Sequence, residues 1–237
     1  MAGSITIENV RVRRGSFTLA LNELSIRPRE IFSILGTTGS GKTVLMESIA
    51  GAFPLNEGRI LLDGKDVSSL PIQQRHLGIL YQDYALFPHL TVAENIAYGL
   101  RHNGLSADAA HSRVADIMER FGISHLADRH PGIISGGESQ RTALARALVL
   151  EPSILLLDEP FSALDPSTKL RMYDLMREVH AQYDCTIVFV THDFNEARTL
   201  ADRIGIILNG RMRVVCTPDD LFTQTDPDIR RFLGIKP

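Results

Sequence analysis

The sequence predicts an α/β fold with a mixed, mainly parallel sheet, an N-terminal antiparallel β subdomain and an inserted helical subdomain. Residues 5–12 and 19–26 alternate apolar and polar side chains, as half-buried strands do. Residues 154–157 and 186–190 are continuously apolar, which is typical of parallel strands covered on both faces. Residues 89–122 instead carry apolar side chains at helical spacing, which indicates a helical segment between the strands.

The elements before this helical segment follow one another closely. Residues 31–35 predict a short buried strand, and a Gly-rich turn leads from it into a helix over 43–50. Gly51 is a plausible C-terminal cap of that helix. Residues 59–62 predict a further strand, and Asp63-Gly64 after it indicates a hairpin.

We therefore expect a single domain over residues 1–237, in which the helical subdomain is an insert. The insert occupies about 83–150, where the sequence character changes. Residues 1–82 and 151–237 supply the antiparallel β subdomain and the main sheet. Between the two apolar strands of the second part, four apolar residues fit one helix face. They are Met172, Leu175, Met176 and Val179.

Composition excludes several classes of protein. Hydrophobic residues make up 44% and charged residues 22%, which is average for globular proteins and excludes disorder. The net charge of -3 gives no reason to expect a nucleic-acid partner. No apolar run reaches the roughly 18–20 residues that cross a bilayer, and no signal-peptide pattern begins the chain. Cys185 and Cys216 lack metal-ligand spacing, so we expect small buried residues of a reducing compartment.

The Gly-rich turn carries a phosphate-binding motif. The sequence GTTGSGKT matches G-x-x-x-x-G-K-[ST] between a predicted strand and a predicted helix. Its glycines let backbone N–H groups approach phosphate oxygens, and the helix N-terminus attracts an anion. The motif predicts a P-loop NTPase core, in which Lys42 reaches the β- and γ-phosphates and Thr43 offers its hydroxyl to Mg²⁺. The residues expected to hold the nucleotide here are Gly36, Thr37, Thr38, Gly39, Ser40, Gly41, Lys42, Thr43 and Val44.

Two acids follow the apolar strand at residues 154–157. A parallel sheet places its ligand sites at the C-terminal ends of its strands. Asp158 can hold Mg²⁺ there through the water shell of the ion. Glu159, one residue on, can act as a general base for an attacking water.

The sequence Ser135-Gly136-Gly137-Glu138 resembles the signature motif of the ABC ATPase family. Taken alone, the same residues are also a capping box that opens an ordinary helix. Because the chain already has one phosphate cradle, a second anion-binding helix end needs another ATP. The simplest arrangement is a head-to-tail dimer in which each cradle faces the signature of a second copy of the chain.

The remaining marks of the family occur in its usual order and extend the resemblance over nearly the whole chain. Gln82 matches the Q-loop, Ser162-Ala163-Leu164-Asp165 matches the D-loop, and His192 matches the switch histidine. The resemblance implies an ATPase that uses ATP and Mg²⁺, with Asp165 and the signature among its ATP contacts. It implies the catalytic set Glu159, His192, Gln82 and Lys42, and the metal set Thr43, Gln82 and Asp158.

The chain departs from the family pattern at the position of the aromatic residue that stacks on adenine. That position holds Arg14, and either Arg14 or the nearby Phe17 could cover the base. Val44 replaces a common Thr and removes a hydroxyl contact to phosphate. Glu138 replaces a common Gln in the signature, but this leaves the backbone donors in place.

The stretch Tyr81–Val92 resembles importer ATPases of prokaryotes, and Val44 with Tyr84 resembles the molybdate/tungstate group among them. The resemblance implies a peripheral subunit on the cytoplasmic face of the cell membrane. Its implied partners are separate transmembrane permease subunits and, indirectly, a substrate-binding protein. An exposed cluster of Tyr84, Leu86 and Phe87 would suit the permease; alternatively, these residues are core of the helical insert.

Two other functions compete with transport. One is a soluble ABC ATPase in DNA repair or translation, although such proteins usually join two cassettes or insert a long coiled coil. The other is a regulatory subunit that binds ATP without turnover, against which the intact catalytic residues weigh. Some importer ATPases carry a C-terminal regulatory domain, and we expect none in a chain that ends at Pro237.

Overall fold

A computed structural model describes residues 2–102, 104–162 and 164–235. Ten strands in these residues form one sheet in the order β5-β4-β1-β2-β10-β9-β3-β8-β7-β6. The strands are β1 Ile5–Arg14, β2 Phe17–Ile26, β3 Ile31–Leu35, β4 Glu57–Leu62, β5 Lys65–Asp66, β6 Gly78–Leu80, β7 Ile154–Asp158, β8 Thr186–Thr191, β9 Arg203–Leu208 and β10 Arg211–Cys216. The α-helices are α1 Lys42–Ala50, α2 Val92–Ala97, α3 Ala107–Arg120, α4 Gly136–Leu148, α5 Pro166–Gln182, α6 Phe194–Leu200 and α7 Pro227–Phe232.

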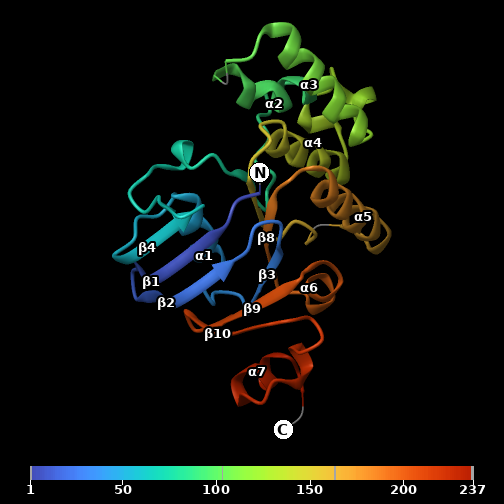
Figure 1. The fold of residues 1–237 in the computed structure, drawn as a ribbon. Helices are drawn as coiled ribbons and strands as arrows, with labels where there is room; N and C mark the ends of the chain where they lie inside the picture. The colour runs from blue at the N-terminus through green and yellow to red at the C-terminus, as the bar shows by residue number, and fades with distance from the viewer. Residues whose placement is uncertain (1, 103, 163, 236–237) are drawn as a thin grey trace.

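The sheet has a parallel part and an antiparallel part, which confirms the predicted fold class. Strands β9, β3, β8, β7 and β6 are parallel neighbours. Strands β5, β4, β1 and β2 pair antiparallel, and β10 joins the two parts by pairing with both β9 and β2. In Figure 1 the antiparallel part lies at the left, below a lobe that contains α2, α3 and α4.

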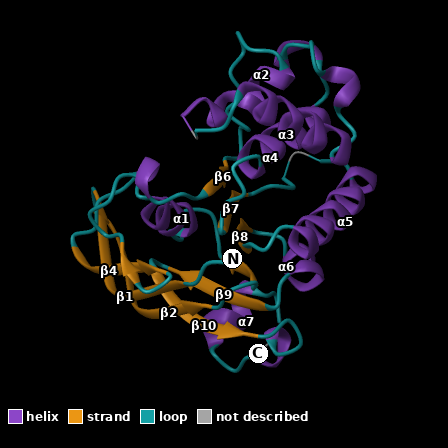
Figure 2. Ribbon diagram, turned by 45° about the horizontal axis from the view of Figure 1, so that its top comes forward, coloured by secondary structure: helices purple, strands orange, loops and turns teal. Residues whose placement is uncertain are grey.

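Alternate residues of the parallel strands enter two apolar clusters, which explains why these strands are continuously apolar. In β7, Ile154 and Leu156 pack with α1 and the antiparallel strands. Leu155 and Leu157 face the other way, toward residues of α4 and α5. Figure 2 shows α1 on one side of these strands and α5 and α6 on the other. The parallel strands are therefore buried on both faces, as predicted.

The helical segment expected over 89–122 is helical, and its described residues form two separate α-helices, α2 and α3. Helix α2 begins with a capping box formed by Thr91 and Glu94, and a 3-10 turn over Tyr98–His102 follows it. Gly104 has a φ of 79°, a left-handed conformation that interrupts a helix. Ser106 then caps α3 by accepting a hydrogen bond from the Ala109 N–H. Local capping chemistry therefore divides one periodic segment into two helices.

Two further expectations concern burial and membrane spans. Cys185 and Cys216 are both buried free thiols, as predicted, and burial raises the pKa of Cys185 to about 11. Among the described helices, none combines the length and the apolar character that crossing a bilayer requires.

Candidate nucleotide site

The turn between β3 and α1 is shaped by glycines that no other residue could replace without displacement. A Cβ on Gly36 would lie 2.3 Å from the Ile207 carbonyl oxygen. Gly41 has a φ of 107°, and a Cβ there would lie 2.8 Å from the Phe17 ring. The close contacts and the left-handed backbone hold the turn as a tight loop at the N-terminus of α1, where backbone N–H groups can receive phosphate.

Lys42 and Ser40 are the buried polar side chains of this loop. Lys42 Nζ donates to the carbonyl oxygens of Gly36 and Thr37, at 2.9 and 3.0 Å. Burial lowers the pKa of Lys42, while Glu159 and Asp158 act in the opposite direction. Ser40 Oγ is buried and makes no hydrogen bond within the described part of the chain. An unpaired buried hydroxyl is costly, so Ser40 fits a loop that receives an additional polar ligand.

Thr43 and Asp158 meet where α1 begins and β7 ends. The Thr43 hydroxyl donates to Asp158 Oδ2 over 3.4 Å. Burial raises the pKa of Asp158, and the neighbouring Glu159 raises it further. Hydroxyl and carboxylate oxygens suit Mg²⁺, and a bound cation would favour the ionised carboxylate. Gln82 is exposed in the turn after β6, and among the described residues it makes no hydrogen bond to either Thr43 or Asp158.

Glu159 and His192 follow neighbouring parallel strands and contact each other. His192 Nδ1 lies 3.3 Å from Glu159 Oε1. Glu159 has a φ of 44°, and its N–H donates to the Val190 carbonyl of β8 over 3.0 Å. This left-handed turn at the end of β7 brings the carboxylate to the histidine. An acid and an imidazole in contact are suited to proton transfer.

The signature residues form a separate hollow at the start of α4. Ser135 caps α4, donating its N–H and hydroxyl to Glu138 Oε2, each at 2.7 Å. Asp165 caps α5 by accepting hydrogen bonds from the N–H groups of Ser167 and Thr168. A pocket of about 360 Å³ lies between these helix starts. Its lining includes Ser135, Gly136, Gly137, Glu138 and Asp165 but no residue of the phosphate loop. Ala163 of the D-loop sequence lies outside the described residues.

Known proteins resemble this chain in sequence and in fold. The sequence model of the ABC transporter family matches residues 20–162. The molybdate/tungstate import ATP-binding protein WtpC of Pyrococcus abyssi (strain GE5 / Orsay) is 44% identical over 98% of this chain and 68% of its own length. The sulfate/thiosulfate import ATP-binding protein CysA of Nephroselmis olivacea is 41% identical over the same shares. The chain belongs to the ABC transporter family.

Solved structures agree with this membership. The ATP-binding cassette MJ0796, in a dimeric post-hydrolysis state with ADP and Pi, has a TM-score of 0.77 and 27% identity, covering 90% of this chain and 98% of its own. Structure cbiO1 from Clostridium perfringens, part of the complex cbiONQ, has a TM-score of 0.84 and 29% identity, covering 98% of both chains. The P-loop NTPase fold and the ATP-hydrolysing class are therefore confirmed. The soluble and non-hydrolysing alternatives are not favoured.

The two candidates for adenine lie in different surroundings in this ABC ATPase. The Arg14 guanidinium lies 3.2 Å above the centre of the Phe53 ring, so this cation already has an aromatic partner. The Phe17 ring instead borders the phosphate loop beside Gly41. Phe53 was not singled out from the sequence, because a lone aromatic residue after a helix gives no signal of its contact with Arg14.

Gln140 is a second residue that sequence reasoning missed. It is fully buried in α4, and its side-chain amide donates to the carbonyl of Pro160, the residue after Glu159. It therefore ties the signature helix of this ABC ATPase to the loop that carries the predicted base. A polar residue on the apolar face of an amphipathic helix was the available sign.

The expectation of an exposed aromatic cluster after Gln82 is wrong. Tyr84 and Leu86 are half-buried and pack against the main apolar cluster. The Phe87 ring lies 4.4 Å from the Tyr98 ring. Arg146 of α4 donates to the carbonyls of Tyr84 and Ala85, both at 2.8 Å, which holds the segment against the signature helix. None of the three is fully buried, so they lie at the edge of the apolar cluster rather than in its core.

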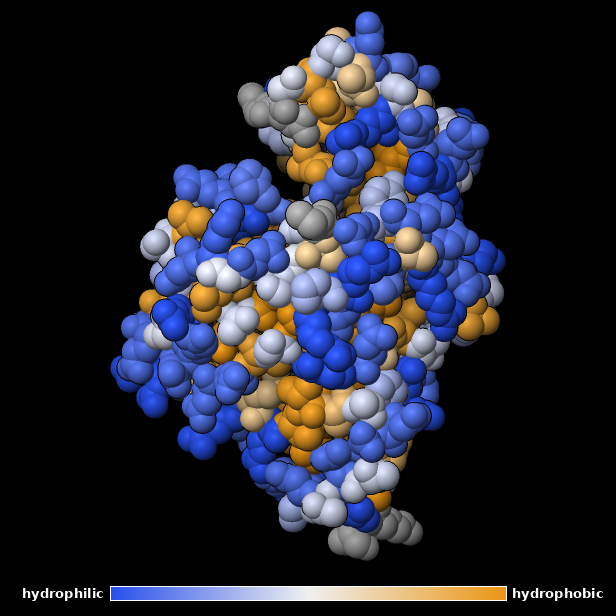
Figure 3. Space-filling view, in the orientation of Figure 1, coloured by the Kyte–Doolittle hydropathy of each residue, from blue (hydrophilic) through white to orange (hydrophobic). Residues whose placement is uncertain are grey.

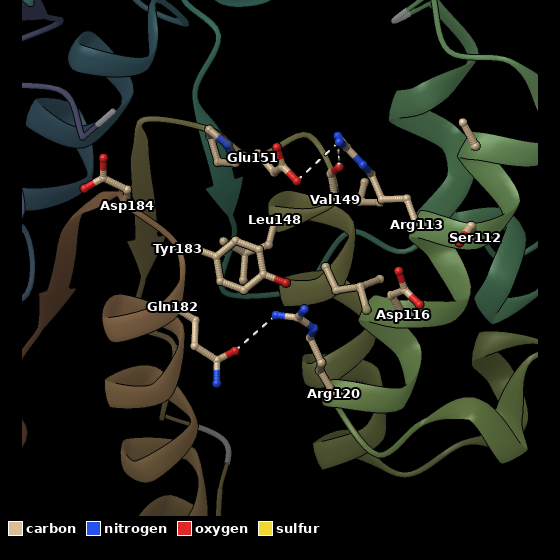
Figure 4. Close-up of a pocket in the computed structure, with 13 residues that line it drawn as sticks. Ser112, Arg113, Asp116, Arg120, Leu148, Val149, Glu151, Gln182, Tyr183 and Asp184 are labelled. Carbon is tan, nitrogen blue, oxygen red and sulfur yellow. Dashed lines mark hydrogen bonds and ion pairs between the residues drawn. The ribbon is translucent and has the colours of Figure 1, made fainter.

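A polar cleft of about 710 Å³ separates α3 from the C-terminal end of α5. Figure 4 shows Arg113 and Arg120 reaching across it from α3. Arg113 Nη2 lies 3.3 Å from Glu151 Oε1, and Arg120 Nη1 donates to Gln182 Oε1 over 3.2 Å. The cleft contains none of the nucleotide motifs, and its bridges join α3 to the end of α5 and to the turn before β7.

Proposed function

We propose that this ABC ATPase powers the uptake of a tetrahedral oxyanion across a cell membrane. The proposal rests on two side-chain contacts beside the phosphate loop. Thr43 contacts Asp158, and Glu159 contacts His192. The relatives in molybdate/tungstate and sulfate/thiosulfate import support the substrate class, since their shared substrates are tetrahedral oxyanions.

Each residue of the site has a proposed role in ATP hydrolysis. Thr43 and Asp158 would hold Mg²⁺, with Gln82 as a further proposed ligand. The ion would supply positive charge to the phosphate oxygens. Lys42 exchanges its two carbonyl partners for the β- and γ-phosphates. Glu159 accepts a proton from the attacking water, and His192 orients Glu159 and contacts the γ-phosphate.

The proposed working unit is a head-to-tail dimer of this chain. The phosphate loop and the signature pocket are lined by different residues, so one copy does not bring them to one ATP. In the dimer the signature, Ser135–Glu138, and Asp165 would face the nucleotide of the second copy. The dimeric state of MJ0796 is consistent with this arrangement.

A permease helix is the proposed occupant of an apolar groove in the helical lobe. The groove measures about 890 Å³ and is lined by apolar residues of α2 and α3. Apolar surface gathers on this lobe at the top of Figure 3. Glu94 and Glu119 also line the groove, which suits an amphipathic helix with basic flanks. The subunit would thus lie peripherally on the cytoplasmic face, with a substrate-binding protein supplying the permease from the other side.

Reconstitution tests the proposal. The complex purified from its native membrane is placed in lipid vesicles, and its ATPase rate is measured with the binding protein empty or loaded with molybdate, tungstate or sulfate. We expect at least one oxyanion to stimulate turnover, and Lys42→Ala to abolish it. Recovery of the chain with ribosomes or DNA and without a permease would contradict transport. Absence of stimulation by every oxyanion would contradict the substrate class.

A further inference from the structure

A buried carboxylate lies beside the segment that carries the switch histidine. Glu196 of α6 is only 3% exposed, and both of its oxygens have partners. Oε1 lies 2.8 Å from Lys169 Nζ, and Oε2 accepts the hydroxyl of Thr191. Thr191 immediately precedes His192, so the carboxylate fixes one neighbour of the histidine.

The same network also holds the residue after His192. Thr191 Oγ1 accepts the N–H of Asp193 over 3.0 Å, and Lys169 Nζ lies 3.8 Å from the Asp193 carboxylate. The His192 side chain itself is 61% exposed, and its recorded ring contact is with Glu159. Because its own packing is slight, the position of the imidazole depends on these two fixed neighbours.

The other end of the network reaches the D-loop. Lys169 lies in the first turns of α5, where its N–H donates to the carbonyl of Asp165 over 2.9 Å. Asp165 caps this helix and lines the signature pocket. A buried charge pair adds little net stability, because desolvation offsets attraction. A geometric role explains better why Lys169 and Glu196 occupy this place.

We propose that Lys169 and Glu196 are positioning residues that hold His192 against Glu159 and tie it to the start of α5. Through Asp165, the position of the histidine then depends on how the second copy in the dimer packs against the D-loop. The inference rests on the proposed role of His192 in hydrolysis.

Steady-state ATPase kinetics of the full chain with Mg²⁺ test the inference. For Lys169→Met we expect kcat to fall roughly three- to thirty-fold with KM unchanged, as for residues that couple sites without touching ligand. Lys169→Arg should recover most of the rate. Glu196→Gln should lose a similar factor, and the double variant should lose little more, because both changes break one network.

Arg177→Met is the matched control. Arg177 also joins α5 to α6, through the Thr199 carbonyl at 3.1 Å, but it is two helical turns further along α5. We expect its kcat to stay at the wild-type level. If Lys169→Met does not fold, the near-isosteric Glu196→Gln carries the same expectations.

His192→Ala, measured in parallel, separates the two proposals. A wild-type rate in His192→Ala would refute the proposed role of the histidine. A large loss in His192→Ala with wild-type rates in Lys169→Met and Glu196→Gln would overturn the positioning inference alone. Equal losses in Lys169→Met and Arg177→Met would also overturn it, since they would indicate general damage to the helix pair.

Discussion

Individual residues of the nucleotide site depend strongly on backbone conformation. Glu159 occupies the left-handed region at a φ of 44°, which is uncommon for a residue with a side chain. Gly41 has a φ of 107°, and because it has no Cβ it leaves room for the Phe17 ring. The Phe17 ring therefore lies at the edge of the phosphate loop. Arg14, in contrast, is engaged with Phe53.

Phe17, rather than Arg14, is therefore expected to cover adenine. Phe17→Ala should weaken ATP binding about ten-fold, because stacking of a base on an aromatic ring contributes roughly 1–3 kcal/mol. Arg14→Ala should change affinity by less than about two-fold, since the guanidinium already has its own partner. Titration calorimetry with ATP measures both. The opposite ranking of the two variants would assign the base to Arg14.

At the scale of elements, the start of α4 combines a helix cap with a proposed phosphate receptor. Hydrogen bonds from Ser135 are the main cause that lowers the pKa of Glu138, so the carboxylate is ionised near neutral pH. In the proposed dimer this negative charge would face an incoming γ-phosphate. The resulting repulsion opposes closure of the dimer.

Glu138→Gln should tighten the ATP-dependent dimer. Glutamine can still complete the capping box, so α4 should keep its start. Removing the repulsion, about 1 kcal/mol for unit charges 4 Å apart in water at each of the two sites of the dimer, corresponds to about thirty-fold tighter association. Analytical ultracentrifugation in a Glu159→Gln background measures it. Glu94→Gln, in the equivalent capping box of α2, is the control. A weaker dimer in Glu138→Gln would mean that the carboxylate assists closure.

Strands and helices were predicted well where a short run of residues carried the pattern. The strand at 31–35 matches β3, and the helix expected over 43–50 is α1 with one residue added. Strands β9 and β10 were not predicted, although β9 contains an apolar run. In the nucleotide site, the motifs predicted that Thr43 and Asp158 lie close to each other, as they do. They gave no sign of Glu196, because its partners Lys169 and Thr191 lie on two other elements, α5 and β8.

On the scale of the whole molecule, the helical lobe and the sheet share one apolar cluster. Val114 and Ile117 of α3 belong to the same cluster as Leu155 and Leu157 of β7. The proposed dimer would join two such units through ATP. Its lifetime would then be set by hydrolysis, which removes the γ-phosphate from between the copies.

Glu159→Gln is expected to trap that dimer. The amide cannot take a proton from water, so turnover should fall by at least about a hundred-fold. ATP affinity should stay within about two-fold, because the phosphate loop is unchanged, and gel filtration with ATP should show a stable dimer. Glu178→Gln, at an exposed position of α5, controls for loss of charge. A normal hydrolysis rate in Glu159→Gln would show that another group is the base.

The two carbonyl partners of Lys42 have a consequence for ligand selection. A nucleotide draws this lysine away from Gly36 and Thr37 only if its phosphate chain offers oxygens in exchange. A nucleoside monophosphate has no such oxygens at the β and γ positions, so the ammonium would stay on the carbonyls. Selection by chain length would then appear in the time for which a nucleotide remains bound rather than in how fast it arrives.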